Sequence, residues 1–176
     1  MHVARPEKLS HGQTILYEVD MLRLAAGTLL RGEMSEENKW VYLEDFLLHY
    51  RNLIDFLGHR RPRGDDLHIT RPNDFVLSSA DPETIEKLNA AGSRLWEDPD
   101  TGSDIIAKYL HHCTMKRVDA KCWPVSKMNN ELEEQLSELE RLLEGINRAW
   151  PAVPAVRFPG AKYVGSPACA VYDDDE

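Results

Sequence analysis

Arginine, histidine and acidic side chains occur at helical spacing in two segments of the chain. Arg51 and Asp55 stand four residues apart, so their side chains can pair along one face of a helix. His112 and Arg117 lie in the second segment, on or beside the apolar face of a predicted helix. An imidazole can act as general acid or base, and a guanidinium can stabilise the charge of a phosphate. These residue types would allow proton transfer at a phosphate group, provided that the two segments meet.

Each of these residues also has a purely structural interpretation. Arg51 and Asp55 can form a surface ion pair that contributes a few tenths of a kcal/mol, or Arg51 can reach across to a polar site. His112 beside an apolar face can be an ordinary boundary residue, and Arg117 needs a carboxylate, which Asp55 or Glu44 could supply. We expect Asp55 to pair with Arg117 between the two helices, with Arg51 and His112 at the rim of the pair.

Two short motifs carry a resemblance. The run YRNLIDFL from Tyr50 to Leu57 resembles an "(A/Y)RNLxDF" helix of a group of uncharacterised bacterial helical proteins. The run IAKYLHHCTMKR from Ile106 to Arg117 resembles the second motif of that group, "INKxLxHLTxxR". The matching residues are Arg51, Asn52, Asp55, Lys108, His112, Thr114, Arg117 and a following Trp123. The resemblance implies a helical fold and a polar cluster, with Asn52, Asp55 and Thr114 as binding residues.

The same group is reminiscent of HEPN-type helical bundles, several of which are RNA-cleaving toxins or antiphage effectors. Those enzymes carry an arginine and a histidine a few residues apart on one helix. The nearest such pair here is Arg51 and His59, which are further apart and separated by Gly58. The resemblance therefore implies a nuclease only if His112 meets Arg51 from another helix.

Five amphipathic segments must position these residues. The first predicted helix covers 15–31 and ends before Gly32, and the second begins after Ser35 and stops at Gly58. The second carries an apolar seam at coiled-coil-like spacing. Its residues are Trp40, Leu43, Leu47, Tyr50, Ile54 and Leu57. Phe56 lies outside this seam and is the candidate for a dimer contact.

The remaining helices follow a loop at 59–75. Asp81 followed by Pro82 predicts a helix start, and this third helix runs to about Trp96. The fourth is expected from about 103 to 118 and the fifth from about 124 to 150. The sequence thus predicts an all-α bundle over 15–150, a lead-in at 1–14, and an extended, proline-rich tail at 151–176 with a disordered acidic end.

Composition narrows the classes of function. Net charge is −9, which opposes general attraction to nucleic acid or anionic membranes. A local basic patch at Arg60, Arg61, Arg63 and Arg71 is the exception. No segment has the roughly 20 apolar residues of a membrane span, and neither a signal peptide nor paired cysteines are evident. We expect a cytoplasmic protein with no metal and no cofactor.

The sequence leaves two functions open, so it does not decide whether the chain is an enzyme. The first is a non-enzymatic helical interaction module with a protein partner or a second copy, in a bacterial defence or toxin–antitoxin context. The alternative is a metal-independent HEPN-like ribonuclease that uses His112 with Arg51 or Arg117. An enzyme requires Arg51 and His112 in one open cleft, whereas a module would hold these residues in closed, paired contacts.

Overall fold

The protein is a bundle of helices, as the sequence predicts. The computed structural model describes residues 10–32, 34–71, 81–110, 121–146, 162–163 and 170–171. Five helices lie within these ranges. They are α1 (His11–Arg31), α2 (Glu36–Gly58), α3 (Pro82–Trp96), α4 (Ser103–Leu110) and α5 (Val125–Leu142). The all-α prediction is confirmed.

Local capping interactions set most helix ends. Ser35 caps α2, and Asp81 with Pro82 behind it starts α3, both as predicted. Gly32 closes α1 in the left-handed conformation at φ 72°. The predicted start of α1 at Ile15 is wrong, because Ser10 and Gln13 form a capping box that begins the helix at His11. The proposed lead-in therefore extends too far into the chain.

The C-terminal half departs from the prediction in length. α5 ends at Leu142 instead of near residue 150, because the chain turns at 143–145 and Gly145 has φ 92°. The predicted extension of α4 to residue 118 lies outside the described residues, as does most of the predicted tail. Two described pieces of that tail, β1 (Lys162–Tyr163) and β2 (Ala170–Val171), form a short antiparallel ladder.

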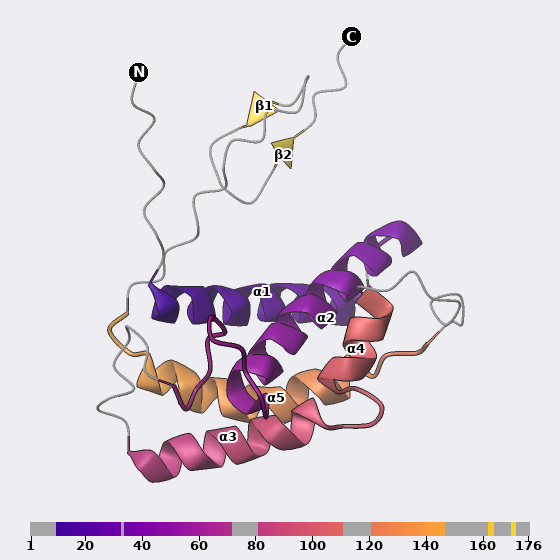
Figure 1. Cartoon of the computed structure of the whole chain (residues 1–176). Coiled ribbons are helices and arrows are strands. Elements are labelled where there is room, and N and C mark those ends of the chain that lie inside the picture. Colours follow the sequence, from indigo (N-terminus) through magenta and orange to yellow (C-terminus); the bar gives the residue numbers. More distant parts are fainter. Residues whose placement is uncertain are drawn as a thin grey trace.

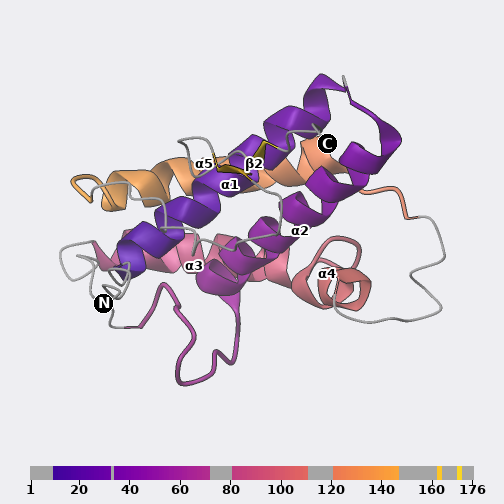
Figure 2. The same ribbon diagram turned by 90° about the horizontal axis from the view of Figure 1, so that it is seen from above.

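Helix α2 is the central element of the bundle. It crosses the molecule obliquely and contacts α1, α3 and α4, while α5 packs against α1 and α3 (Figures 1 and 2). Apolar side chains from these helices and from the segments that connect them form one core. Its largest fully buried members are Tyr50, Phe46, Leu22, Leu53, Ile54, Leu57, Ile69, Ile106, Met128, Leu132, Leu136 and Leu139. A central helix must bury more than one face, which affects which of its polar residues can reach solvent.

Two predicted roles on α2 are wrong for this reason. Phe56, the candidate for a dimer contact, is only 2% exposed because α2 is covered on several sides. Trp40, the first residue of the predicted seam, is 57% exposed because the seam extends past the part of α2 that its neighbours cover. Leu47, Tyr50, Ile54 and Leu57 of the seam are buried as predicted.

The backbones of α2 and α3 touch at a pair of glycines. A Cβ atom on Gly58 would lie 2.1 Å from the carbonyl carbon of Gly92, and one on Gly92 would lie 2.4 Å from Cβ of Leu57. Asn89 donates to the Leu57 carbonyl at 2.6 Å, and Ser93 donates to the Gly58 carbonyl at 3.2 Å. Side chains of α3 thus satisfy carbonyls at the end of α2 that have no partner within the helix.

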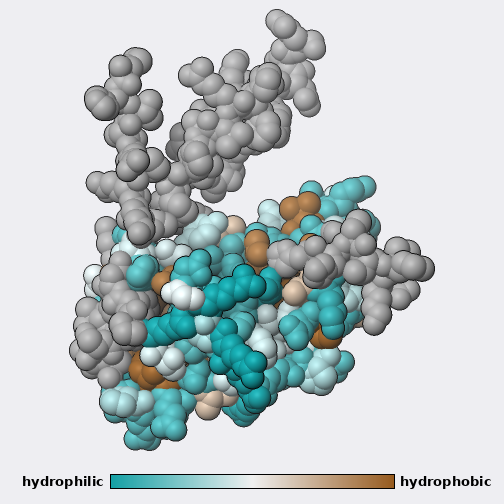
Figure 3. All heavy atoms as spheres, viewed as in Figure 1, coloured by the Kyte–Doolittle hydropathy of each residue, from teal (hydrophilic) through white to brown (hydrophobic). Residues whose placement is uncertain are grey.

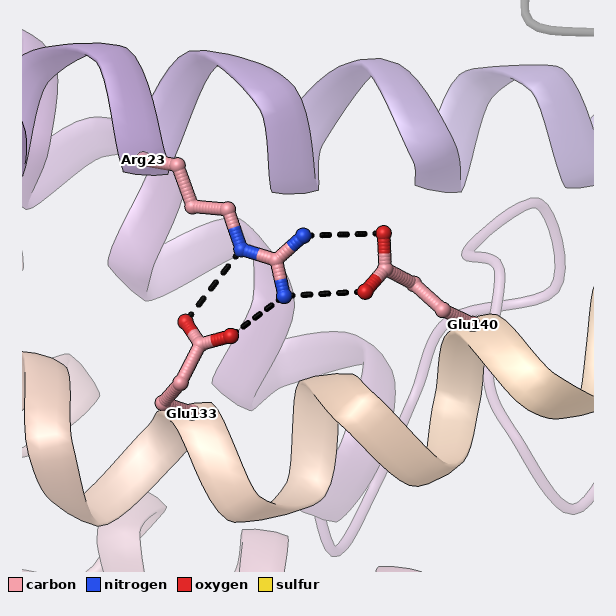
Figure 4. A network of polar contacts seen from close by, with 3 residues as sticks. All are labelled: Arg23, Glu133 and Glu140. Atoms are coloured by element: carbon pink, nitrogen blue, oxygen red, sulfur yellow. Dashed lines mark hydrogen bonds and ion pairs between the residues drawn. The ribbon is translucent and has the colours of Figure 1, made fainter.

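A network of charged side chains joins α1 to α5. Arg23 lies between Glu133 and Glu140, with its guanidinium bonded to both carboxylates (Figure 4). One terminal nitrogen of Arg23 donates to Glu140 Oε1 at 2.9 Å, and Nε donates to Glu133 Oε2 at 3.3 Å. The hydrogen bonds that Arg23 donates to Glu133 raise the pKa of Arg23, and Glu140 adds to the effect against the cost of partial burial. This network lies away from the predicted site.

Candidate functional site

A surface pocket of about 390 Å³ contains the predicted site residues that the structure describes. It lies between the first half of α1, the last half of α2 and the connection that follows α2. The lining residues are Thr14, Ile15, Glu18, Arg51, Asn52, Asp55, Phe56, His59, Pro62, Arg63, Asp66 and Leu67. Arg51, Asn52 and Asp55 belong to the run that carries the resemblance, and one turn of α2 brings them to this pocket.

The Asp55 carboxylate joins three helices. Its Oδ1 accepts hydrogen bonds from the Trp96 indole and from the Ser103 hydroxyl, both at 2.7 Å. Trp96 ends α3 and Ser103 begins α4, so Asp55 holds these two ends against α2. Its side chain is 26% exposed. The predicted partner of Asp55, Arg117, lies outside the described residues.

Arg51 lies beside this carboxylate. Its Nε is 3.5 Å from Asp55 Oδ2, which is the i,i+4 pair that the spacing predicts. The same Nε donates to Ser103 Oγ at 3.2 Å, so Arg51 also reaches another helix. The side chain is 27% exposed. Both sequence interpretations of Arg51 are therefore partly met, since it forms the local pair and reaches across the bundle.

Asn52 belongs to a separate polar cluster between α1 and α2. Its amide nitrogen donates to Glu18 Oε2 at 3.0 Å. The ring of His49 contacts the same oxygen through Nδ1 at 2.7 Å and Asp45 Oδ1 through Nε2 at 3.2 Å. Tyr17 packs edge-on against the ring at 5.7 Å. A histidine between two carboxylates can satisfy both only by donating from both nitrogens, which is its charged form.

His49 is buried, with 4% of its surface exposed. Burial alone would lower its pKa, but hydrogen bonds and charge from Asp45 and Glu18 outweigh this cost and raise the pKa of His49 to about 9. The imidazolium is thus the stable form at neutral pH. Sequence analysis missed this cluster because Glu18 and His49 lie far apart in the chain. The available signal was a run of Asp45, His49 and Asn52 on one side of α2.

His59 lines the pocket from the end of α2. Its Nδ1 accepts the Arg61 backbone N–H at 2.9 Å, and its ring packs on Trp96 at 5.0 Å. Arg51 and His59 therefore line one pocket although Gly58 ends the helix between them. This juxtaposition brings a guanidinium and an imidazole to one surface depression.

Three of the predicted site residues cannot be placed. His112, Thr114 and Arg117 lie outside the described residues, so the expected meeting of His112 with Arg51 stays a prediction. Lys108 is in α4, and Trp123 is a core residue just before α5, where it packs edge-on against Tyr109 at 5.2 Å.

The described ranges also bear on metals and membranes. Within them, no group of three histidine, cysteine or acidic side chains could hold a metal ion. None of the helices found there combines the length and the apolar character that crossing a bilayer requires.

Comparison with known proteins leaves the geometry as the basis for function. No family model matches the chain, and neither a curated protein nor a solved structure is significantly similar to it.

Proposed function

We propose that the chain is a non-enzymatic helical interaction module. The observation that carries this proposal is how the Asp55 carboxylate is engaged within the bundle. Its carboxylate is occupied by Trp96, Ser103 and Arg51, groups whose role here is to join helices. A catalytic carboxylate would instead direct its oxygens towards a substrate. A role in a bacterial defence or toxin–antitoxin system is part of the proposal and rests on the resemblance alone.

The exposed side of α2 is the surface that suits a partner. Trp40, Val41 and Leu48 are 57%, 63% and 37% exposed. Hydrophobic residues interrupt the hydrophilic surface near the N-terminal end of α2 (Figure 3). Glu37 and Glu44 are also exposed and share the face of Val41 and Leu48, since the four positions are three or four residues apart. We call these five residues the acidic–apolar stripe.

Charge selects the partner for this stripe. Two carboxylates alternate with the apolar side chains, and the chain carries −9 overall. A second copy would bring like charges together, and nucleic acid or an anionic membrane would be repelled. The partner that fits is a protein segment with apolar and basic side chains on one helical face.

A peptide assay tests this docking. We expect a labelled helical peptide of leucine and lysine to bind, whereas the same peptide with glutamate in place of lysine does not. The double variant Trp40→Ser and Val41→Ser should lose binding. The matched variant Leu24→Ser, which alters a 47% exposed residue of α1, should retain it. Equal binding by both variants, or dimerisation through the stripe in sedimentation, would contradict the proposal.

A metal-independent ribonuclease is the alternative, with His112 as acid or base and Arg51 or Arg117 at the phosphate. The presence of Arg51 and His59 in one pocket favours it. The assay is cleavage of end-labelled RNA in chelator by the wild type and by Arg51→Ala and His112→Ala. We expect no cleavage above the protein-free control. Cleavage that both variants abolish would make the enzyme the better proposal.

A further inference from the structure

The geometry points to a binding site for an organic cation, an alkylammonium or guanidinium group, in the pocket between α1 and α2, with Glu18 as its acceptor. This site goes beyond the proposed docking on the stripe, because the stripe residues do not line the pocket.

Glu18 is held in place from one side. Its Oε2 receives both the His49 ring at 2.7 Å and the Asn52 amide at 3.0 Å, and both donors come from α2. Its other oxygen, Oε1, receives no hydrogen bond from any group in the described ranges. A carboxylate has about four lone-pair sites, so Oε1 can accept from a ligand without disturbing either contact. With 15% of its side chain exposed, Glu18 is a fixed acceptor at the pocket wall.

The charges around the pocket give the sign of the ligand. Asp55 faces Arg51, and Asp66 lies on the same connection as Arg63 and accepts its backbone N–H at 2.5 Å. These four lining side chains therefore cancel in net charge. The second cluster holds Glu18 and Asp45 around one imidazolium, so it keeps one negative charge. The residual charge lies on the cluster that meets the pocket through Glu18.

The pocket offers more than a charge. Ile15, Phe56 and Leu67 line it beside the polar groups, and its volume of about 390 Å³ is within the range of small-ligand sites. An aliphatic stem can pack on the partly exposed Leu67 while its charged end meets Glu18. The chemistry that fits is a cation at the end of a short aliphatic chain. A free amine such as agmatine or the arginine or lysine side chain of a protein segment carries this chemistry.

Calorimetry with defined probes tests the site and separates these two sources. The probes are agmatine, putrescine, the blocked residue N-acetyl-arginine-methylamide, and its uncharged citrulline counterpart. We expect the charged probes to bind and the citrulline probe not to bind, since only a cation gains from the Glu18 carboxylate. Preference for the blocked arginine over agmatine would identify a protein side chain as the source, and the reverse would identify a free amine.

Variants establish whether Glu18 is the acceptor. Glu18→Gln should weaken binding of the preferred probe by about tenfold or more. Glu86→Gln removes the same charge from an exposed position of α3 and should leave binding unchanged. If Glu18→Gln does not fold, Asn52→Ala provides the second test. It removes one of the two donors that hold the Glu18 carboxylate in place, so binding should also weaken. The Trp40→Ser and Val41→Ser double variant should bind the probes normally. A failure of the proposed partner docking on the stripe would therefore not affect this result.

Three outcomes of the calorimetry would overturn the inference. They are the absence of binding to the wild type at millimolar probe, equal binding of the citrulline probe, and undiminished binding by a folded Glu18→Gln. In a parallel proton NMR titration, the ring proton resonances of His49 should shift as agmatine is added, because His49 contacts the Glu18 carboxylate. A probe that binds without moving these resonances occupies another site and would equally contradict the inference.

Discussion

Trp96 donates its indole N–H to Asp55 across 2.7 Å, and this bond connects the last residue of α3 to α2. Ser103 and Arg51 meet the same carboxylate, so one side chain satisfies donors from three helices. The carboxylate oxygens of Asp55 therefore stabilise the packing of α3 and α4 against α2.

Removing the Asp55 carboxylate should destabilise the fold. Asp55→Ala leaves the Trp96 indole and the Ser103 hydroxyl without their acceptor, and we expect a loss of about 1–3 kcal/mol in the free energy of unfolding. Trp96→Phe removes one of these bonds and should cost less. Urea denaturation of both single variants and of the double variant measures the coupling. Additive losses would contradict a direct bond.

The buried His49 should make stability depend on pH. Its pKa is about 9 in the folded chain, above the value near 6.5 of an unfolded histidine. Because the folded pKa is raised, the contribution is fully present below pH 6.5 and is lost as the pH rises through about 9. The shift corresponds to roughly 3 kcal/mol. Urea denaturation between pH 6 and 10 checks this, and His49→Gln should flatten the decline.

The contacts of Arg23 should contribute modestly and depend on salt. Its side chain is 34% exposed, so we expect Arg23→Met, which retains most of the apolar stem, to cost about 1 kcal/mol at low ionic strength and less at high salt. The control is Arg141→Met on α5, whose pair with Glu138 is confined to one helix. The control should leave the melting temperature almost unchanged. Equal effects of the two variants would show that α1 gains nothing from α5 at this contact.

The glycine pair between α2 and α3 should tolerate no side chain. Gly92→Ala would place its Cβ within 2.4 Å of Leu57 Cβ, and we expect a loss of roughly 1–3 kcal/mol. Gly27→Ala is the matched control, because a Cβ there meets nothing within 4 Å. Removing a glycine from the interior of α1 should stabilise by about 0.5–1 kcal/mol. In thermal denaturation, the melting temperature should therefore fall for Gly92→Ala and rise for Gly27→Ala.

The sequence predicted local features of the fold better than contacts between helices. Ser35 and Asp81 mark helix starts because a cap needs only its own next turn. Trp40 and Phe56 were misplaced because the apolar period of one helix does not indicate where its neighbours lie. The four-residue spacing of Arg51 and Asp55 correctly predicted their ion pair, which lies within one helix.

The contacts of the candidate site show the same limit. Asp55 with Trp96, and Glu18 with His49, join residues that are distant in the chain. Such pairs depend on how helices cross, and a single sequence does not contain that information. The acidic and basic residues could be identified from their types, but their partners could not.

The contact between Gly58 and Gly92 also has a consequence for the order of folding. α1 and α2 are consecutive and pair across a short turn, so they can form a hairpin early, with little loop to close. α3 can dock only when α2 is helical to its last turn, because Asn89 and Ser93 bond to the Leu57 and Gly58 carbonyls there. The amide protons at the end of α2 should therefore exchange with solvent only as fast as α3 detaches, and Gly92→Ala should speed unfolding far more than it slows refolding.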